Sequence, residues 1–260
     1  MSFNCQVNSI KKLPSKDGEL WRAWHRNGKL DYVGNKKNNQ RDGEWSFFHP
    51  NGQKESKGEY VMGEKQGCWI EWYENGQIYS QREFENGQKN GLIKCWYKNG
   101  QVDVQGNYLK DNRIGKWQWF FDDGQIEVQA NYEDNKRTGR WQWFFDNGQI
   151  ETKGKYFDGE KIGQWSWYKK TGQISLQVEY EMGGKITGGF KRWYENGQIK
   201  CQGYFDNDLR VGEWNWWYDN GQIKTEVSYN NSTNKIDEWQ WEQRNETKET
   251  KSLQDAISIN

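Results

Sequence analysis

Apolar and polar positions alternate along most of the chain, and the alternation is interrupted at regular intervals by glycine. Ile174, Leu176, Val178 and Tyr180 occupy every second position, with polar residues between them. Because successive side chains of a β-strand point to opposite faces of a sheet, this period of two predicts strands with one buried face. Asn-Gly-Gln sequences separate neighbouring alternating segments, and Asn-Gly is the strongest short-range signal of a β-hairpin. The pattern therefore predicts strand, turn and strand as the recurring element.

The hairpin pattern occurs about nine times. Its turn glycine recurs every 24 residues, with one spacing of 25, at Gly28, Gly52, Gly76, Gly100, Gly124, Gly148, Gly172, Gly197 and Gly221. A second glycine stands nine residues before the turn in all units but the first, from Gly43 to Gly212. A fixed period of this length is typical of repeat proteins, in which each unit contacts only its neighbours. We therefore expect an all-β, elongated repeat array of about nine 24-residue antiparallel β-hairpins that forms a twisted single-layer sheet.

The two connections of each unit are expected to differ. Asn precedes the turn glycine in seven of the nine units, and Asp123 and Thr171 stand there in the other two. We expect two-residue type I′ turns at Asn-Gly, because this turn needs positive φ at both central residues. The second connection, for example 133–138 or 158–162, carries Gly, Asn, Asp and Lys. We expect it to be a loop that returns the chain to the next hairpin.

The repeat divides the chain into three segments. Residues 1–18 lack the period and are expected to form an N-terminal cap or extension. Residues 19–241 form the array, which we expect to end in a strand around Trp239 and Trp241. Residues 242–260 are polar and are expected to form a C-terminal tail. Because the N-terminal residues contain no apolar run of about 7 to 15 residues, they do not resemble a secretory signal, and we expect a cytoplasmic location.

Aromatic residues are numerous enough to form the core. The 260 residues include 18 Trp, 14 Tyr and 11 Phe, and 37 basic residues balance 37 acidic ones. Aromatic side chains each bury on the order of 150 to 250 Å². No segment approaches the roughly 18 consecutive apolar residues of a membrane helix. A net charge of zero provides no basic field for phosphate, so we expect neither nucleic-acid binding nor binding to anionic membranes.

The aromatic residues form two columns that recur with the repeat. The first column is Trp21, Trp45, Trp69, Ile93, Trp117, Trp141, Trp165, Phe190 and Trp214. The second column, three residues further on, is Trp24, Phe48, Trp72, Trp96, Phe120, Phe144, Tyr168, Trp193 and Trp217. Strand alternation places the two columns on opposite faces. Either the rings pack on one another along each column, or the second column is an exposed stripe and a candidate interaction surface.

Two sets of titratable residues are candidates for chemistry, and each has a simpler explanation. His25 and His49 occupy one repeat position, which later units fill with Tyr or Phe. Two imidazoles could share a metal or sense pH, but replacement of one aromatic residue by another explains them better, and no third ligand is evident. Glu127 and Glu151, one period apart, could form a carboxylate ladder, although a solvated strand face is the better interpretation.

The remaining chemistry-bearing residues show no site. Cys5, Cys68, Cys95 and Cys201 have neither zinc-ligand nor disulfide-framework spacing, so we expect reduced, packed thiols. The glycines follow the 24-residue period and form no phosphate-binding loop. A catalytic group would be a special position that breaks the repeat, and the sequence shows no convincing one. We therefore expect no enzymatic activity, no cofactor and no metal.

Residues 156–174 and 205–223 show the pattern Y-x-N/D-G-x-K/R-x-G-x-W-x-x-Y/F-Y-x-N-G-Q-I. This pattern resembles the MORN repeat, specifically the bacterial-type variant with N-G-Q hairpins, over roughly residues 19–241. The resemblance implies a non-enzymatic protein–protein interaction scaffold with a protein or peptide partner, and an antitoxin-like or immunity role as its bacterial form. Exposed sheet edges or faces would also allow a homo-oligomer. The alternative is a glycan- or lipid-binding module that uses the second aromatic column as an exposed stripe.

Overall fold

The computed structural model describes residues 9–15 and 18–229, and the side chains from residue 18 onward. The chain divides into two compact parts, residues 1–150 and residues 151–260, which we call the N-terminal part and the C-terminal part. All regular elements within the described ranges are β-strands, which confirms the predicted all-β class. The described residues contain no helix that is long and apolar enough to cross a membrane.

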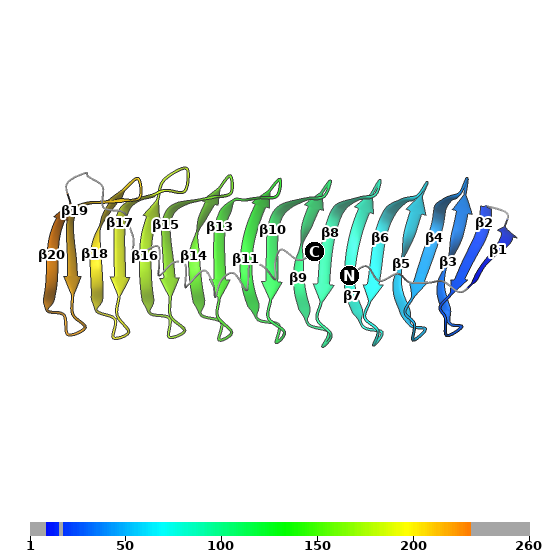
Figure 1. Ribbon diagram of the computed structural model, residues 1–260, viewed down its shortest axis with the longest axis horizontal. Helices are drawn as coiled ribbons and strands as arrows, with labels where there is room; N and C mark the ends of the chain where they lie inside the picture. The colour runs from blue at the N-terminus through cyan, green and yellow to red at the C-terminus, as the bar shows by residue number, and fades with distance from the viewer. Residues whose placement is uncertain (1–8, 16–17, 230–260) are drawn as a thin grey trace. The chain divides into compact units, whose positions relative to one another are not determined.

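Each strand of the N-terminal part pairs antiparallel with its neighbours in sequence (Figure 1). The strands are β1 (Ser9–Ser15), β2 (Gly18–Trp24), β3 (Leu30–Lys37), β4 (Gln40–Phe48), β5 (Lys54–Val61), β6 (Glu64–Trp72), β7 (Ile78–Glu85), β8 (Gln88–Trp96), β9 (Val102–Leu109), β10 (Asn112–Phe120), β11 (Ile126–Glu133), β12 (Lys136–Arg137) and β13 (Gly139–Phe144). Both β12 and β13 pair with β11, so they are one strand with an interruption at Thr138.

The strands of the C-terminal part pair in the same way. They are β14 (Ile150–Phe157), β15 (Glu160–Tyr168), β16 (Ile174–Tyr180), β17 (Ile186–Trp193), β18 (Ile199–Asp206), β19 (Leu209–Trp217) and β20 (Ile223–Tyr229). The predicted hairpin repeat is thus confirmed. The N-terminal extension contributes β1, a strand that the sequence pattern did not indicate. The expected strand around Trp239 and Trp241 and the tail at 242–260 lie outside the described residues.

The Asn-Gly turns are not type I′, so this prediction is wrong. In the turn after β4, the His49 carbonyl accepts a hydrogen bond from Gly52 N–H, and His49 N–H donates to the Gln53 carbonyl. Gly52 has a φ of +88°, whereas Asn51 is not among the residues with positive φ. One positive φ at the third loop residue defines a three-residue hairpin with a type I turn and a glycine bulge. The remaining Asn-Gly turns repeat these two hydrogen bonds.

Type I′ turns occur instead at the second connections. The sequence predicted loops that return the chain to the next hairpin at these positions. Asp158 and Gly159 have φ values of +50° and +91°, and Phe157 pairs directly with Glu160. Two consecutive residues with positive φ between paired strands are the mark of this turn, and Asn, Asp and Gly tolerate that conformation best. The connection at residues 181–185, which holds the single extra residue of the array, instead has the hydrogen bonds of a three-residue loop.

The glycine nine residues before each turn creates a bulge that positions the first-column tryptophan. Gly43 has a φ of +73°, and the pairing of β3 with β4 shifts between Asn35 and Gly34. The bulge lays the Trp45 indole flat on Gly34, where an added Cβ would lie 2.2 Å from the ring. The carbonyl of Asn35 accepts a hydrogen bond from Trp45 Nε1 at 2.9 Å. Local strand distortion thus buries one indole in each of the six units that carry Trp45, Trp69, Trp117, Trp141, Trp165 or Trp214.

The first column is buried from Trp45 onward, whereas Trp21 is half-buried, and tyrosines from the intervening strands fill the space between its rings. Trp45 is 1% exposed, and its ring centroid lies 6.1 Å from that of Tyr60, which lies 4.9 Å from that of Trp69. The Arg41 guanidinium lies 4.7 Å from the Trp45 ring centroid and donates to the Tyr60 hydroxyl at 3.0 Å. Arg113 and Arg210 repeat this cation–π contact at Trp117 and Trp214. These contacts cover one face of the hairpins.

Candidate functional site

The second aromatic column is half-buried throughout, in contrast to the first. In the N-terminal part it comprises Trp24, Phe48, Trp72, Trp96, Phe120 and Phe144, and in the C-terminal part Tyr168, Trp193 and Trp217. We call these residues the aromatic stripe. Each precedes the turn by one residue and lies on the face opposite the buried tryptophans, because strand alternation separates position 45 from position 48. The stripe therefore offers partly accessible rings at the turn ends of the strands.

From Phe48 to Trp217, the described rings of the stripe do not pack on one another. Within either part, the described residues from Phe48 to Trp217 show no ring contact between two stripe members. The spacing explains this: equivalent residues are two strands apart, on the order of 9.6 Å, whereas aromatic pairs need about 4.5 to 7 Å between centroids. On the buried face a tyrosine fills that gap. Between Phe48 and Trp217 the described stripe has no such ring, so the expected mutual packing along this column is not seen within either part there.

Lysines accompany the stripe. Lys54 Nζ lies 5.7 Å from the centroid of the Trp72 ring, and Lys94 Nζ lies 5.5 Å from that of Trp96. In the C-terminal part, Lys153 Nζ lies 5.1 Å from the Tyr168 ring. Cation–π attraction between such exposed groups is worth about 0.5 to 1 kcal/mol. The accessible aromatic surface therefore carries a positive charge beside several of its rings.

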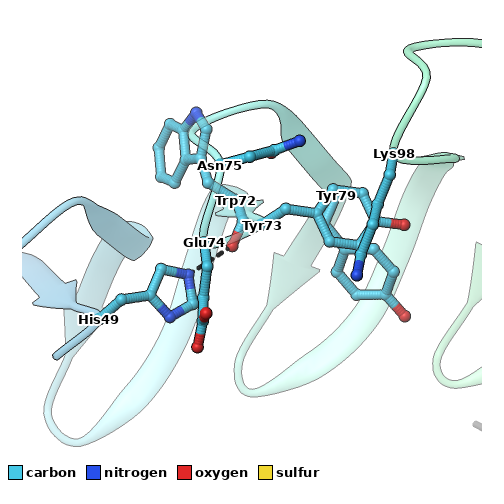
Figure 2. Close-up of a pocket in the computed structure, with 7 residues that line it drawn as sticks. All are labelled: His49, Trp72, Tyr73, Glu74, Asn75, Tyr79 and Lys98. Atoms are coloured by element: carbon cyan, nitrogen blue, oxygen red, sulfur yellow. Dashed lines mark hydrogen bonds between the residues drawn. The ribbon is translucent and has the colours of Figure 1, made fainter. Parts of the chain in front are cut away.

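A pocket of about 410 Å³ lies at the turn ends of β4, β6, β7 and β8 (Figure 2). It is lined by His49, Trp72, Tyr73, Glu74, Asn75, Tyr79 and Lys98. Its volume falls within the range of about 300 to 1,000 Å³ that is usual for ligand sites. The Tyr73 and Tyr79 ring centroids are 5.0 Å apart, and Lys98 Nζ lies 5.7 Å from that of Tyr73. The rings of Tyr73 and Tyr79 thus adjoin each other in this pocket, whereas Figure 2 shows the Trp72 indole pointing away from them.

Tyr79 is a departure from the repeat, and the sequence analysis missed it. Five of the eight other units carry an acid at this position, among them Asp31, Glu55 and Asp103. In the next unit, burial raises the pKa of Asp103, and a hydrogen bond with Tyr97 lowers it in part. At Tyr79 a ring replaces the carboxylate, and burial raises the pKa of its hydroxyl. Comparing each repeat position across units would have singled out Tyr79.

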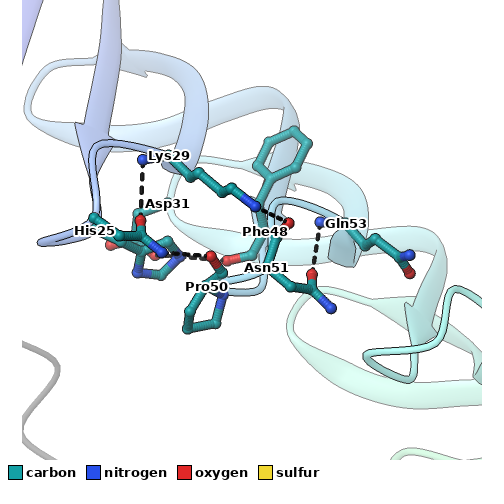
Figure 3. A network of polar contacts seen from close by, with 8 residues as sticks. His25, Lys29, Asp31, Phe48, Pro50, Asn51 and Gln53 are labelled. Carbon is teal, nitrogen blue, oxygen red and sulfur yellow. Dashed lines mark hydrogen bonds and ion pairs between the residues drawn. The ribbon is translucent and has the colours of Figure 1, made fainter.

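His25 and His49 belong to the connections between neighbouring turns. His25 Nε2 lies 2.7 Å from the Phe48 carbonyl oxygen (Figure 3). His49 Nε2 lies 2.8 Å from the Trp72 carbonyl oxygen (Figure 2). Tyr73 and Tyr97, one and two units later, donate from their hydroxyls to the equivalent carbonyls. The replacement of one aromatic residue by another therefore keeps a hydrogen bond between units. No metal-binding cluster of His, Cys, Asp or Glu occurs among the described residues.

The asparagine of the Asn-Gly-Gln sequence also joins neighbouring turns. Asn51 Oδ1 accepts from Gln53 N–H at 2.9 Å within its own turn, and Asn51 Nδ2 donates to the Glu74 carbonyl of the next turn at 2.7 Å. Asn27 donates in the same way to the Pro50 carbonyl. Asp123 retains only the acceptor function, toward Gln125 N–H. The turns next to the stripe are thus held together by side-chain hydrogen bonds.

A polar cluster on the buried face was also missed by the sequence analysis. Glu71 Oε2 accepts from Ser80 Oγ at 2.6 Å and from Arg82 Nη1 at 3.1 Å. Most other units place an aromatic residue at the position of Glu71 and glycine at that of Arg82. Arg82 also contacts the Cys95 thiol, whose pKa burial raises. Periodicity reveals the substitutions but not the pairing between strands. The cluster replaces ring packing in the third and fourth units.

The cysteines and the two glutamates singled out in the sequence do not form a common site within the described residues. Cys95 and Cys201 are buried, whereas Cys68 is exposed, so the expectation of packed thiols is wrong for Cys68. Glu127 lies on β11 in the N-terminal part and Glu151 on β14 in the C-terminal part, and both are half-buried. Cys5 lies outside the described residues.

Known structures show only distant similarity to this chain. A porin-like protein from Bacteroides uniformis is 9% identical over 84% of this chain and 92% of its own, with a TM-score of 0.21. A TcdB2–TccC3–Cdc42 complex is 11% identical over 82% of this chain and 14% of its own, with a TM-score of 0.16. The Photorhabdus luminescens Tc holotoxin pore is 12% identical over 85% and 14%, with a TM-score of 0.16. No protein of curated function matches the sequence.

Comparison with protein families identifies the repeat. The model of the MORN repeat variant matches seven segments, which are residues 41–62, 65–86, 89–110, 113–134, 137–158, 187–207 and 210–231. Each matched segment contains one Asn-Gly-Gln-type turn with its flanking strands. Together the segments cover more than half of the chain, and they agree with the repeating hairpins of both parts. The chain therefore belongs to the MORN repeat variant family.

Proposed function

We propose that this protein is a non-enzymatic scaffold of the cytoplasm that binds a protein partner through the aromatic stripe. The observation that carries the proposal is the contrast between the two columns. First-column rings such as Trp45 are buried under tyrosines, whereas stripe rings such as Trp72 are half-buried and have no aromatic neighbour within the stripe. Partly exposed rings in regular array on a rigid surface favour recognition over core packing.

The chemistry of the stripe suits a protein interface. Trp and Tyr are enriched among the residues that carry most of the energy of protein–protein binding. The hydrogen bonds of Asn51 and His49 to neighbouring turns hold the strand ends that present Phe48 and Trp72. A surface that is ordered before binding loses less conformational entropy on association. The repeat therefore supplies both the rings and the rigidity of a binding surface.

The proposal is tested by affinity capture from a native lysate with wild type and the double variant Trp72→Ala and Trp96→Ala. Circular dichroism first establishes that the variant is folded. We expect wild type to retain a specific protein and the variant to lose it, because truncation of interface aromatics commonly costs more than about 1 kcal/mol each. The matched control is Met62→Asn, which removes a 71% exposed apolar side chain from a type I′ turn away from the stripe.

Two results would contradict the proposal. Retention of the same protein by the folded double variant would place the interface elsewhere. Binding of a glycan or lipid by wild type, with no protein retained, would assign the stripe to the alternative class.

An antitoxin or immunity role is the specific form of this function that the family resemblance implies. In that case the retained protein is a toxin that inhibits growth of the cells producing it, and co-expression of the scaffold relieves this inhibition. We expect the double variant Trp72→Ala and Trp96→Ala to lose that relief while Met62→Asn keeps it. A retained protein with no inhibitory effect on growth would exclude this role but leave the binding function intact.

A further inference from the structure

A row of exposed charged residues crosses the strands of the N-terminal part on the same face as the stripe. It consists of Glu59 on β5, Glu83 on β7, Lys116 on β10 and Arg140 on β13, and we call these residues the charge row. Each cation stands four residues before a member of the stripe. Each acid pairs directly with the residue in that position on the preceding strand. Because alternate residues and directly paired residues share a face, all four side chains lie on the stripe face.

The charge row has an acidic half and a basic half, and neither is neutralised within the N-terminal part. Neither cation has an acidic partner among the described residues, and neither acid has a cationic one. Glu59 stands directly opposite Glu44, whose carboxylate is already paired with a lysine at 2.9 Å. Like charges directly opposite each other on neighbouring strands are destabilising. The row therefore presents two opposite charge excesses that an external partner can neutralise.

A hollow of about 280 Å³ lies between the two cations of the row. Lys116 pairs directly with Asn131 of β11, whose Nδ2 donates to the Arg140 carbonyl at 2.8 Å. The polar side chains that line the hollow are Lys116, Gln118, Gln129, Asn131, Arg140 and Gln142. No acidic residue is found among the described residues that line it. The basic half therefore has room for the acidic side chains of an approaching surface.

A two-fold rotation places each half of the row on the opposite half of a second copy. Its axis lies between the facing copies, parallel to the strands, and passes between β8 and β9. Because β12 and β13 form one strand, the rotation sets β7 over β10 and β5 over β13. Glu83 of each copy then faces Lys116 of the other, Glu59 faces Arg140, and the symmetry repeats both pairs. Glu83 and Lys116 lie only about 7 Å from the axis, where the twist of the two sheets separates them least.

The same rotation fits the stripe of one copy to that of the other. Stripe rings pair directly with aliphatic residues of the next strand, and the pairs are Trp72 with Ile78, Trp96 with Val102 and Phe120 with Ile126. Aromatic and aliphatic side chains therefore alternate from strand to strand. The rotation exchanges β6 with β11, β7 with β10 and β8 with β9, so each of these rings meets an aliphatic residue of the second copy. The rings of one copy thus lie over the gaps of about 9.6 Å between the rings of the other.

We propose that the N-terminal part also binds a second copy of itself, face to face and antiparallel, through the charge row and the stripe from Trp72 to Phe120. The charge row sets the register of the two copies, and the stripe supplies the apolar contact. Dilution dissociates the dimer and exposes the stripe, so a second copy and another protein partner exclude each other at this surface. The inference goes beyond the proposed scaffold function and does not depend on it.

The test is sedimentation velocity of the full-length protein with complementary charge reversals. One variant carries Glu59→Lys and Glu83→Lys and has an entirely basic row, and the other carries Lys116→Glu and Arg140→Glu and has an entirely acidic one. We expect wild type to form a dimer and each variant alone to remain a monomer, with a dissociation constant raised at least tenfold, or about 1.4 kcal/mol. An equimolar mixture of the two variants should dimerise again, because every acid of one then faces a cation of the other.

Controls separate this contact from general effects of charge and folding. Circular dichroism establishes that both variants are folded, and Glu83→Lys mixed with Lys116→Glu repeats the experiment with one reversal per copy. The same charge change in the C-terminal part, by Glu213→Lys and Glu226→Lys at two exposed positions, should leave the dimer intact. Dimerisation of wild type should weaken as salt rises, because salt screens exposed charges.

Three results would overturn the inference. They are a wild type that remains monomeric at its highest soluble concentration, a dimer of either charge-reversed variant alone, and a mixture of the two variants that stays monomeric. None of them affects the capture experiment with Trp72→Ala and Trp96→Ala, so the scaffold function would stand. A dimer with the expected charge pattern and no other captured protein would support this inference and overturn the scaffold function.

Discussion

Glycine and tryptophan are paired on the buried face of the hairpins. The indoles of Trp45, Trp69, Trp117, Trp165 and Trp214 each lie on a glycine of the preceding strand, where a Cβ would approach the ring to 2.2 or 2.3 Å. Where Ile93 replaces the tryptophan, Arg82 replaces the glycine, and where Phe190 does so, Val178 stands opposite. Trp141 lies in the unit with Ala130. The glycine is therefore required mainly where an indole must approach the backbone closely.

The close approach is tested by Gly154→Ala. The added Cβ would lie 2.2 Å from the Trp165 ring, so the indole must move, and we expect a loss of about 1 to 3 kcal/mol in the free energy of unfolding. Gly189→Ala is the matched control in the same part, because nothing lies within 4 Å of its Cβ position. Urea denaturation measures both variants. Equal stability of the two would contradict the packing of indole on glycine.

Asp103 introduces a pH-dependent loss of stability. Burial raises its pKa above the ordinary value of 3.8 in the folded protein. The Asp103 carboxyl group therefore loses its proton at lower pH in the unfolded chain than in the folded chain. As pH rises from the pKa of the unfolded state to that of the folded state, the contribution of Asp103 to the free energy of unfolding falls. We expect Asp103→Asn to be more stable than wild type at pH 7 and of similar stability near pH 3. An advantage of wild type at pH 7 in thermal denaturation would contradict this sign.

The hairpins were predicted correctly, but the turn types at their two ends were exchanged. Alternation of apolar residues around Trp165 and Val178 was sufficient to locate the strands. Asn51 was assigned a positive φ on the strength of the Asn-Gly pair, whereas its side chain instead stabilises a right-handed conformation through Gln53 N–H and extends to Glu74. A hydrogen bond to a residue 23 positions away is not visible in local sequence. The turn type could therefore not be predicted from local sequence, because it depends on contacts between units.

The hydrogen bonds between turns are tested at Asn51. Replacement by alanine removes one bond within the turn and one to the Glu74 carbonyl, and we expect a loss of about 1 to 2 kcal/mol in the free energy of unfolding. Asn51→Asp keeps the acceptor, as Asp123 does in its own turn, and should lose about half as much. Chemical denaturation of both variants provides the comparison. A larger loss for the aspartate than for the alanine would show that the turn does not depend on the acceptor.

The repeat and the aromatic stripe could be predicted across the whole molecule, and the departures from the repeat could not. The period placed the first column on a buried face and the second on the opposite face. Glu71, Arg82 and Cys95 interact because strand register brings together residues 11 to 24 positions apart. The pocket at Tyr79 likewise needs Trp72 from the neighbouring strand and Lys98 from the turn after β8. The repeat period identifies the residues that all units have in common. The Glu71 cluster and the Tyr79 pocket are formed by residues that occur in single units only.

Stability should be divided among the repeat units. Each strand pairs only with its neighbours in sequence within each part, so a unit can be removed without leaving unmatched partners. Deletion of residues 115–138 joins Ile114 to Gly139 and restores the same repeat position. We expect a shorter protein with a folded β-sheet spectrum in circular dichroism. Collapse to an unfolded chain would contradict independent repeat units.

Hydroxyl-radical footprinting of the protein, alone and in complex with its captured partner, tests the binding face most directly. In the free protein, Trp72, Trp96, Trp193 and Trp217 should be oxidised faster than the buried Trp45, Trp69, Trp165 and Trp214. In the complex, we expect protection of stripe residues and no change on the buried face. Equal oxidation of both columns in the free protein, or protection confined to residues outside the stripe, would contradict the assignment of this surface as the binding site.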